Sequence, residues 1–182
     1  MLMSLRESRI DSALVYDGGL LKVRRDSVKL PDGNLAFREY IRHPGASVII
    51  AINPHGNLLM VRQFRYPLDR TFLELPAGKI DPGETPLECA RRELREETGY
   101  EASDFREIAT VHPCIGYSDE RLVYFIAENL SHAGKQTDEE EFLENVEISL
   151  GDALEMVRCG EISDGKTVSG LFWAERILSG SW

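Results

Sequence analysis

The stretch that most constrains this chain runs from Gly78 to Tyr100 and reads GKIDPGETPLECARRELREETGY. Its second half predicts a short helix with well-defined ends. Thr85 is a favourable N-cap, Glu88 stands three residues later as its capping-box partner, and a proline occupies the first helical position. Gly99 supplies the left-handed residue that commonly ends a helix. The stretch therefore predicts a glycine-rich loop that leads directly into one rigid helix.

The predicted helix has an apolar side and a carboxylate side, because successive residues lie roughly 100° apart around its axis. We expect the apolar side to pack on the core. It comprises Leu87, Ala90, Leu94 and Thr98. The other side carries Glu93, Glu96 and Glu97, with Arg92 at its edge. A run of charges is usually a solvated face, but carboxylates on a rigid element beside a tight loop also suit hard divalent cations such as Mg²⁺ or Mn²⁺.

The spacing resembles the Nudix box, G-x5-E-x7-R-E-U-x-E-E-x-G-U, in which U is a bulky apolar residue. All the fixed letters are matched, by Gly78, Glu84, Arg92, Glu93, Glu96, Glu97 and Gly99. Leu94 fills the first U, and Tyr100 fills the second, where an aliphatic residue is more usual. The resemblance implies a hydrolase of nucleoside diphosphates that are linked to another group.

Composition limits the cellular setting and the partners. The chain has 182 residues and a net charge of −10, which argues against a nucleic-acid backbone or an anionic membrane as the main partner. It does not argue against a nucleotide substrate, because bound metals can reverse the local field. Cys89, Cys114 and Cys159 form no CxxC pair, and the first residues hold no apolar signal segment. We therefore expect a cytoplasmic protein without a nucleic-acid or membrane partner.

The order of predicted elements indicates the fold class. Strands are predicted in residues 12–43, 46–52, 58–64, 72–75, 105–111, 122–127 and 146–148. Two further helices follow, one capped by Ser149 and one over residues 167–178. This order predicts an α+β fold with a mixed sheet sandwiched between helices, and the Nudix fold is such a sandwich. We expect an N-terminal β extension in residues 1–43 and the catalytic domain in residues 44–182.

Segments outside the box are similar to the ADP-ribose pyrophosphatase branch of the family. They are REYIRHPGA, VRQFRYP, ELPAGKID, HPCIGYSDE and DEEEF. The resemblance implies hydrolysis of ADP-ribose to AMP and ribose 5-phosphate. Another nucleoside diphosphate sugar, such as GDP-mannose, is an alternative, because the sequence does not reveal how the base is recognised. A non-catalytic nucleotide-sensing Nudix module is a second alternative, although such a module would be expected to lose box carboxylates.

The resemblance also implies roles for single residues. The metal, Mg²⁺ or alternatively Mn²⁺, would be held by Glu93, Glu96, Glu97 and the backbone carbonyl of Ala77. Arg92 would orient these carboxylates by charge-assisted hydrogen bonds. Arg92 is also four residues before Glu96, so it can equally be an ordinary helical ion-pair partner of Glu96. Glu84 is interpreted as a structural residue at the positive end of the helix dipole.

An acidic segment late in the chain completes the implied site. The run before Phe142 points to Glu141 as a metal ligand and to Glu139 as the general base. A solvated acidic loop without a role is the alternative. Glu120 is another candidate base.

Substrate contacts are implied for two arginines and one loop. Arg38 and Arg65 would reach phosphate groups, because guanidinium geometry suits bidentate contacts. Gly116, Ser118 and Glu120 would line the ribose side. Relatives are commonly homodimers, so residues 1–43 would pack between two chains and Arg38 would serve the partner's site.

Overall fold

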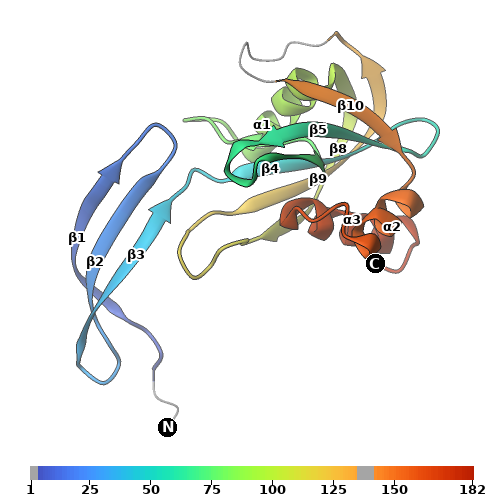
Figure 1. Cartoon of the computed structure of the whole chain (residues 1–182). Helices are drawn as coiled ribbons and strands as arrows, with labels where there is room; N and C mark the ends of the chain where they lie inside the picture. Colours follow the sequence, from blue (N-terminus) through green and yellow to red (C-terminus); the bar gives the residue numbers. More distant parts are fainter. Residues whose placement is uncertain (1–3, 135–141) are drawn as a thin grey trace. The chain divides into compact units, whose positions relative to one another are not determined.

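The computed structural model describes residues 4–134 and 142–182. They form two compact units (Figure 1). The first unit comprises the described residues up to Pro44 together with His112–Arg121, and the second comprises Gly45–Val111 and Leu122–Trp182. The division into an extension and a catalytic domain that the sequence suggests remains a prediction. In the described residues, no helix is long and apolar enough to cross a membrane.

The first unit is built on three antiparallel strands. They are β1 (Ser8–Asp17), β2 (Lys22–Lys29) and β3 (Leu35–Arg42), in that order across the sheet. The segment 112–121 joins the end of β3, where the Ile41 N–H donates to the Tyr117 carbonyl at 2.8 Å. Large apolar side chains of these strands are exposed to solvent: Ile10, Leu14, Val15, Tyr16, Leu35 and Phe37. The described part of this unit therefore buries little apolar surface by itself.

The second unit contains a mixed sheet. Its strands are β4 (Ala46–Ile52), β5 (Leu58–Arg65), β6 (Arg70–Glu74), β7 (Ala77–Lys79), β8 (Tyr100–Val111), β9 (Leu122–His132) and β10 (Leu143–Ile148). The order is β10-β5-β4-β9-β8, with β6 beside β5 and β7 beside β4. β4 and β9 run parallel, and every residue of β4 is buried. A strand that is buried along its whole length is typical of a sheet covered on both faces.

Helices cover both faces of this sheet (Figure 1). They are α1 (Pro86–Glu93), α2 (Leu150–Cys159) and α3 (Gly165–Leu178), with a π-helical turn at Leu94–Thr98 and a 3₁₀ turn at Tyr66–Leu68. One core cluster lies under α2 and α3, and the other lies under α1. The predicted α+β sandwich is confirmed. The last helix begins two residues earlier than expected, because Asp164 caps it by accepting from the Thr167 N–H at 3.0 Å.

The apolar side of the first helix differs from the expectation at one residue. Ala90 and Leu94 are fully buried and Thr98 is 2% exposed, as predicted. Leu87 is 38% exposed, so its predicted place in the core is wrong. Leu87 lies in the first turn, ahead of Ala90 and Leu94, which are the residues that the helix contributes to the core cluster.

Candidate active site

The helix that carries the carboxylates begins and ends as its sequence predicts. The Glu88 N–H donates to Thr85 Oγ1 at 3.3 Å, and the Thr85 N–H donates to Glu88 Oε2 at 2.8 Å, which completes the capping box. Gly99 ends the helical segment in the left-handed region, with φ of 79°. These caps satisfy backbone groups that helix ends otherwise leave unpaired, and they fix the position of the segment between them.

The carboxylates come from two kinds of helical turn. Glu93 is the last residue of α1, whereas Glu96 and Glu97 lie in the π-helical turn Leu94–Thr98. Glu93 is 9% exposed and Glu97 is 4% exposed. This side of the helix is therefore not an ordinary solvated face. Wider turns of this kind often occur at functional sites, because they shift side chains relative to a regular helix.

Gly78 makes room for the carboxylate of Glu93. A Cβ atom at position 78 would lie 1.7 Å from Glu93 Oε1, which is far inside van der Waals contact. Only glycine therefore allows the strand β7 backbone to approach this carboxylate without displacing it. The fixed glycine at this position is explained by close approach and not by an unusual backbone angle.

Arg92 connects three carboxylates at the edge of the helix. Its Nη1 donates to Glu93 Oε1 at 2.7 Å and to Glu96 Oε2 at 3.0 Å. Its Nε and Nη2 donate to the two oxygens of Glu84 at 2.9 and 3.0 Å. These hydrogen bonds from Arg92 hold the pKa of Glu84 below its ordinary value, and those to Glu84 raise the pKa of Arg92. The predicted contact of Arg92 with Glu96 is present, and Glu84 joins the same cluster.

Glu97 is fixed by the first residue of strand β7. The Ala77 N–H donates to Glu97 Oε2 at 3.1 Å. The Ala77 carbonyl and the Glu97 carboxylate were predicted to hold the same metal. The structure places these two residues next to each other. Nearby, Cys89 is fully buried, and burial raises the pKa of its thiol to about 11. A buried thiol with a raised pKa is unreactive at neutral pH, so this environment fits a structural cysteine.

The donor set suits a divalent cation. Glu84, Glu93, Glu96 and Glu97 are four carboxylates, and Arg92 is the cation that contacts three of them. Oxygen ligands with an excess of negative charge are what Mg²⁺ and Mn²⁺ prefer. Within residues 4–134 and 142–182, no three His, Cys, Asp or Glu side chains are already arranged around a common metal position. Arg92 occupies oxygens of Glu93 and Glu96, so their predicted role as ligands remains a prediction.

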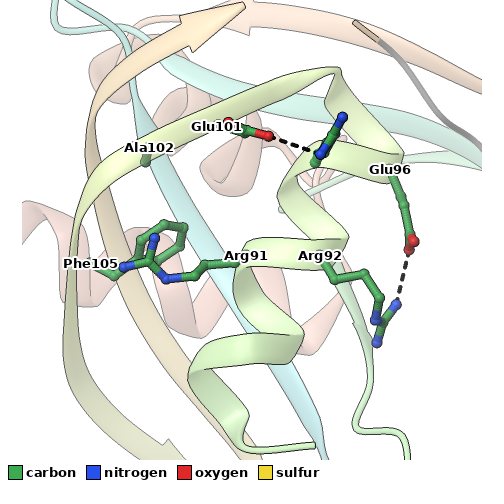
Figure 2. A pocket seen from close by; sticks show the side chains of 7 residues that line it. Arg91, Arg92, Glu96, Glu101, Ala102 and Phe105 are labelled. Atoms are coloured by element: carbon green, nitrogen blue, oxygen red, sulfur yellow. Dashed lines mark hydrogen bonds and ion pairs between the residues drawn. The ribbon is translucent and has the colours of Figure 1, made fainter. Parts of the chain in front are cut away.

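A basic pocket lies on the other side of the same helix (Figure 2). It has a volume of about 420 Å³, and it lies between the helical segment and strand β8. The Arg91 guanidinium lies 4.7 Å from the centre of the Phe105 ring, and Arg95 pairs with Glu101 at 3.1 Å. Arg92 and Glu96 line this pocket and also belong to the carboxylate cluster, and Figure 2 marks the contact between them.

Arg65 belongs to a second cluster of charges in the same unit. Its Nε and Nη2 donate to the two oxygens of Glu74, both at 2.8 Å. Lys166 also pairs with Glu74, and it pairs with Asp164 at 2.8 Å. Burial opposes ionisation of Glu74, but the hydrogen bonds from Arg65 and the charge of Lys166 outweigh it and lower its pKa. Glu74 is therefore a buried, ionised carboxylate between two cations.

The other predicted substrate residues lie in the first unit. Arg38 Nε donates to Glu7 Oε2 at 2.9 Å, and this hydrogen bond raises the pKa of Arg38. In the segment 112–121, the Glu120 N–H donates to Ser118 Oγ at 3.1 Å, and Glu120 Oε1 lies 3.8 Å from His43 Nδ1. A Cβ at Gly116 would meet open space, so no close approach requires this glycine. The substrate roles of these residues remain predictions.

The predicted base Glu139 and the predicted further ligand Glu141 lie outside the described residues. Their roles remain predictions. Of the two candidate bases, Glu139 and Glu120, the structure describes Glu120.

Comparison with known proteins establishes the family. The NUDIX domain profile matches residues 41–168. The chain is 40% identical over 168 residues to an ADP-ribose pyrophosphatase of Bacillus subtilis (strain 168), covering 91% of each chain. It is 38% identical over 164 residues to a methanol dehydrogenase activator of Bacillus methanolicus, covering 89% of each. It is also 36% identical over 147 residues to a GDP-mannose pyrophosphatase of Yersinia enterocolitica, covering 75% of each.

A solved structure described as an ADP compounds hydrolase shares the fold. It has a TM-score of 0.86 and 23% sequence identity, and the match covers 98% of this chain and 97% of that one. The box residues are gathered along one helical segment, and the mixed sheet and helices of the sandwich surround them. The chain belongs to the Nudix family, and it is a Nudix hydrolase.

Two features of the site were missed by sequence reasoning. Glu84 was assigned to the helix dipole, yet its side chain pairs with Arg92, eight residues further on. The spacing of the box places Glu84 and Arg92 on a common side of the helix once the loop folds back. This spacing could therefore have predicted the pair. The contacts of Glu74 with Lys166 span 92 residues, and no local pattern marks them.

Proposed function

We propose that this enzyme hydrolyses the diphosphate of ADP-ribose to AMP and ribose 5-phosphate, with Mg²⁺ as its cofactor and Mn²⁺ as an alternative. The observation that carries the proposal is the cluster of carboxylates around Arg92, next to Gly78. The similarity to the B. subtilis ADP-ribose pyrophosphatase, which extends over 91% of both chains, supports the choice of substrate.

The metal would be held by Glu93, Glu96, Glu97 and the carbonyl oxygen of Ala77. When bound, Mg²⁺ supplies positive charge that offsets the negative charge developing on the phosphate oxygens. The chain itself orients the ligands. Arg92 fixes Glu93 and Glu96 by charge-assisted hydrogen bonds, and the Ala77 N–H fixes Glu97. Held in this way, the carboxylates need little reorganisation when the substrate arrives.

Water attack on phosphorus requires a base and contacts with the substrate. We assign the base to Glu139, with Glu120 as the alternative, and we assign Glu141 as a further metal ligand. Arg65 binds the diphosphate from within the second unit, because it lies on the same unit as the carboxylates. The remaining substrate contacts are assigned to Arg38, Gly116, Ser118 and Glu120.

We further propose that the protein is a cytoplasmic homodimer. The first unit leaves large apolar side chains in water, among them Leu35, which is 73% exposed, and Phe37, which is 59% exposed. A second copy of the chain would cover such a surface. Sedimentation of the full chain tests this, with Phe37→Glu as the variant expected to lower the mass. An unchanged dimer in the variant, or a monomeric wild type, contradicts this part of the proposal.

A substrate panel tests the proposed reaction. Purified protein with Mg²⁺ is supplied with ADP-ribose, GDP-mannose and related nucleoside diphosphate sugars in isotopically labelled water. We expect the fastest cleavage for ADP-ribose, with AMP and ribose 5-phosphate as products, and the label in one product identifies the phosphorus attacked. Faster cleavage of another diphosphate, without release of AMP from ADP-ribose, contradicts the proposal.

GDP-mannose is the second candidate substrate. The similarity to a GDP-mannose pyrophosphatase favours it, at 36% identity over 147 residues. The carboxylate cluster does not distinguish the two substrates, because it faces the diphosphate that both share. The same panel decides between them, since the products of GDP-mannose would be GMP and mannose 1-phosphate. A non-catalytic sensing module would cleave nothing in this panel.

A further inference from the structure

Glu74 is a buried carboxylate without an assigned role. It is 2% exposed at the end of β6, where it receives both hydrogen bonds of Arg65 and the ammonium of Lys166. Buried ion pairs are often no more stabilising than apolar side chains of similar size, because desolvation offsets the attraction. Stability alone is therefore a weak reason to place a glutamate here.

The strand register shows that Glu74 changes the direction of Arg65. On the β5–β6 ladder, Arg65 is the partner of Arg70, whereas Glu74 is the partner of Val61. The Arg65 side chain therefore runs back along its own strand to reach Glu74. This brings the guanidinium toward the end of β6, and β6 leads through two residues to Ala77. A free arginine at this position would instead sample many rotamers in water.

This end of β6 is also the end nearest the carboxylates of the helix. Ala77 donates to Glu97, and Glu97 lies close enough to add to the rise in the pKa of Arg65 that the hydrogen bonds to Glu74 mainly cause. Arg65 is thus within electrostatic range of Glu97. A phosphate group beside that carboxylate would lie within the field of Arg65.

The pairing leaves part of the guanidinium available. Glu74 takes the Nε and Nη2 side of Arg65, and the side chain of Arg65 remains 43% exposed. The planar fork of arginine has further N–H donors on its Nη1 side, which suit phosphate oxygens. Arg65 also lines a pocket of about 510 Å³, together with the cations Arg70 and Lys166 and the carboxylates Glu74 and Asp164.

Lys166 and Thr167 attach this arrangement to α3. Lys166 contacts both Glu74 and Asp164, and the Leu75 N–H donates to Thr167 Oγ1 at 3.0 Å. The carboxylate of Glu74 is therefore held on one side by Lys166 and on the other by Arg65. Because the position of Glu74 is restrained in this way, Glu74 can in turn hold Arg65 in one orientation.

We infer that Glu74 is a positioning residue that orients Arg65, so that the outer side of the guanidinium binds the substrate diphosphate next to Glu97. The inference rests on the proposed function, because it takes Arg65 as a phosphate-binding residue. Glu74 touches neither the metal nor the substrate, and it acts through Arg65.

A double-mutant cycle tests the inference. Glu74→Gln, Arg65→Ala and the double variant are compared with wild type for kcat and KM in the substrate panel. Glu74→Gln should raise KM roughly tenfold with a smaller change in kcat, because it removes the charge that orients Arg65. In the Arg65→Ala background the same substitution should change kcat/KM less than about twofold, since there is no longer an arginine to position.

Binding provides a readout that is independent of turnover. The α,β-methylene analogue of ADP-ribose, which cannot be hydrolysed, is titrated calorimetrically into the same four proteins. Glu74→Gln should raise the dissociation constant in the wild-type background and change it little in the Arg65→Ala background. Equal effects of Glu74→Gln in both backgrounds, or no effect in the wild-type background, would overturn the inference, because a merely structural glutamate acts independently of Arg65.

A matched control and a second variant keep the test decisive. Arg62 and Glu144 form a comparable pair at 3.3 Å, also from β5 to a neighbouring strand, but both are well exposed. Glu144→Gln should leave KM unchanged. If Glu74→Gln unfolds below the assay temperature, Lys166→Gln replaces it, and a smaller rise in KM that disappears with Arg65→Ala is expected.

The outcome is separable from that of the proposed function. If the wild type cleaves GDP-mannose and not ADP-ribose, the proposed substrate is wrong, and the cycle is measured with GDP-mannose and its methylene analogue. The coupling between Glu74 and Arg65 is expected there too, because both substrates carry a diphosphate. Loss of the coupling with the substrate that is cleaved overturns the inference alone.

Discussion

Two clusters of charged residues in the second unit have opposite imbalances. In the cluster on the helix, one cation, Arg92, contacts three carboxylates, Glu84, Glu93 and Glu96. In the cluster on β6, the carboxylates of Glu74 and Asp164 pair with the cations Arg65 and Lys166, and Arg70 lines the same pocket as a third cation. The first therefore has two negative charges in excess, and the second, with Arg70 counted, has one positive charge in excess.

The difference indicates what each cluster binds. An excess of buried charge is unfavourable unless a ligand of opposite charge compensates for it. The carboxylate cluster suits a divalent cation, and the cationic cluster suits a phosphate group. By contrast, Arg158 and Glu155 form an exposed pair on α2 in which the charges balance, and such pairs contribute little. Imbalance, more than the number of ion pairs, distinguishes the site from the surface.

The largest expected effect comes from removing one charge of the carboxylate cluster. Glu97→Gln preserves the shape of the side chain and keeps an acceptor for the Ala77 N–H. It removes the negative charge that we propose binds the metal. We expect a loss of roughly three orders of magnitude in kcat for ADP-ribose, because several kcal/mol of charge stabilisation are lost. Steady-state release of AMP measures this. A loss of less than tenfold would show that Glu97 is not a metal ligand.

A smaller effect is expected from crowding the same cluster without changing its charge. In Gly78→Ala, the new methyl group would overlap Glu93 Oε1 and displace the carboxylate. Misplacement of a catalytic group by about 1 Å can cost roughly 100-fold in rate. Gly19→Ala is the matched control, because a Cβ there meets nothing within 4 Å. Equal activities of the two variants would show that the position of Glu93 does not matter.

The smallest effect concerns the pH dependence of stability. Glu74 has a pKa below its ordinary value of 4.5, since Arg65 and Lys166 outweigh the effect of burial. Below that pH the unfolded chain binds more protons than the folded chain, so stability is present above pH 4.5 and is lost as the pH falls through the lowered pKa. Urea unfolding between about pH 3 and about pH 7 should show a steeper loss of the free energy of unfolding for wild type than for Glu74→Gln. Parallel curves would contradict the assignment of charge to Glu74.

The sequence predicted the parts of the site that depend on local spacing. The capping residues, the carboxylates and Arg92 lie within one stretch, so helical geometry alone brings them together. The sandwich followed from the order of strands and helices. The burial of Leu87 was predicted wrongly, because hydrophobic periodicity does not show at which turn a helix begins to contact the sheet.

Other features depend on pairings between distant segments. Glu74 and Lys166 meet because β6 and α3 pack together, and no pattern in the sequence fixes the rotamer that joins them. The π-helical turn that carries Glu96 and Glu97 also differs from the regular helix that the spacing predicted. Segment 112–121 joins the strands of the first unit through Ile41, a pairing across more than 70 residues of chain.

The central claim is that the excess of carboxylates around Arg92 binds a divalent cation for diphosphate hydrolysis. The most direct test is a titration with Mn²⁺, followed by electron paramagnetic resonance, in the presence of the methylene analogue of ADP-ribose. We predict that wild type removes free Mn²⁺ from solution and that Glu93→Gln weakens this binding by roughly tenfold or more. Equal Mn²⁺ binding by wild type and by Glu93→Gln would contradict the claim.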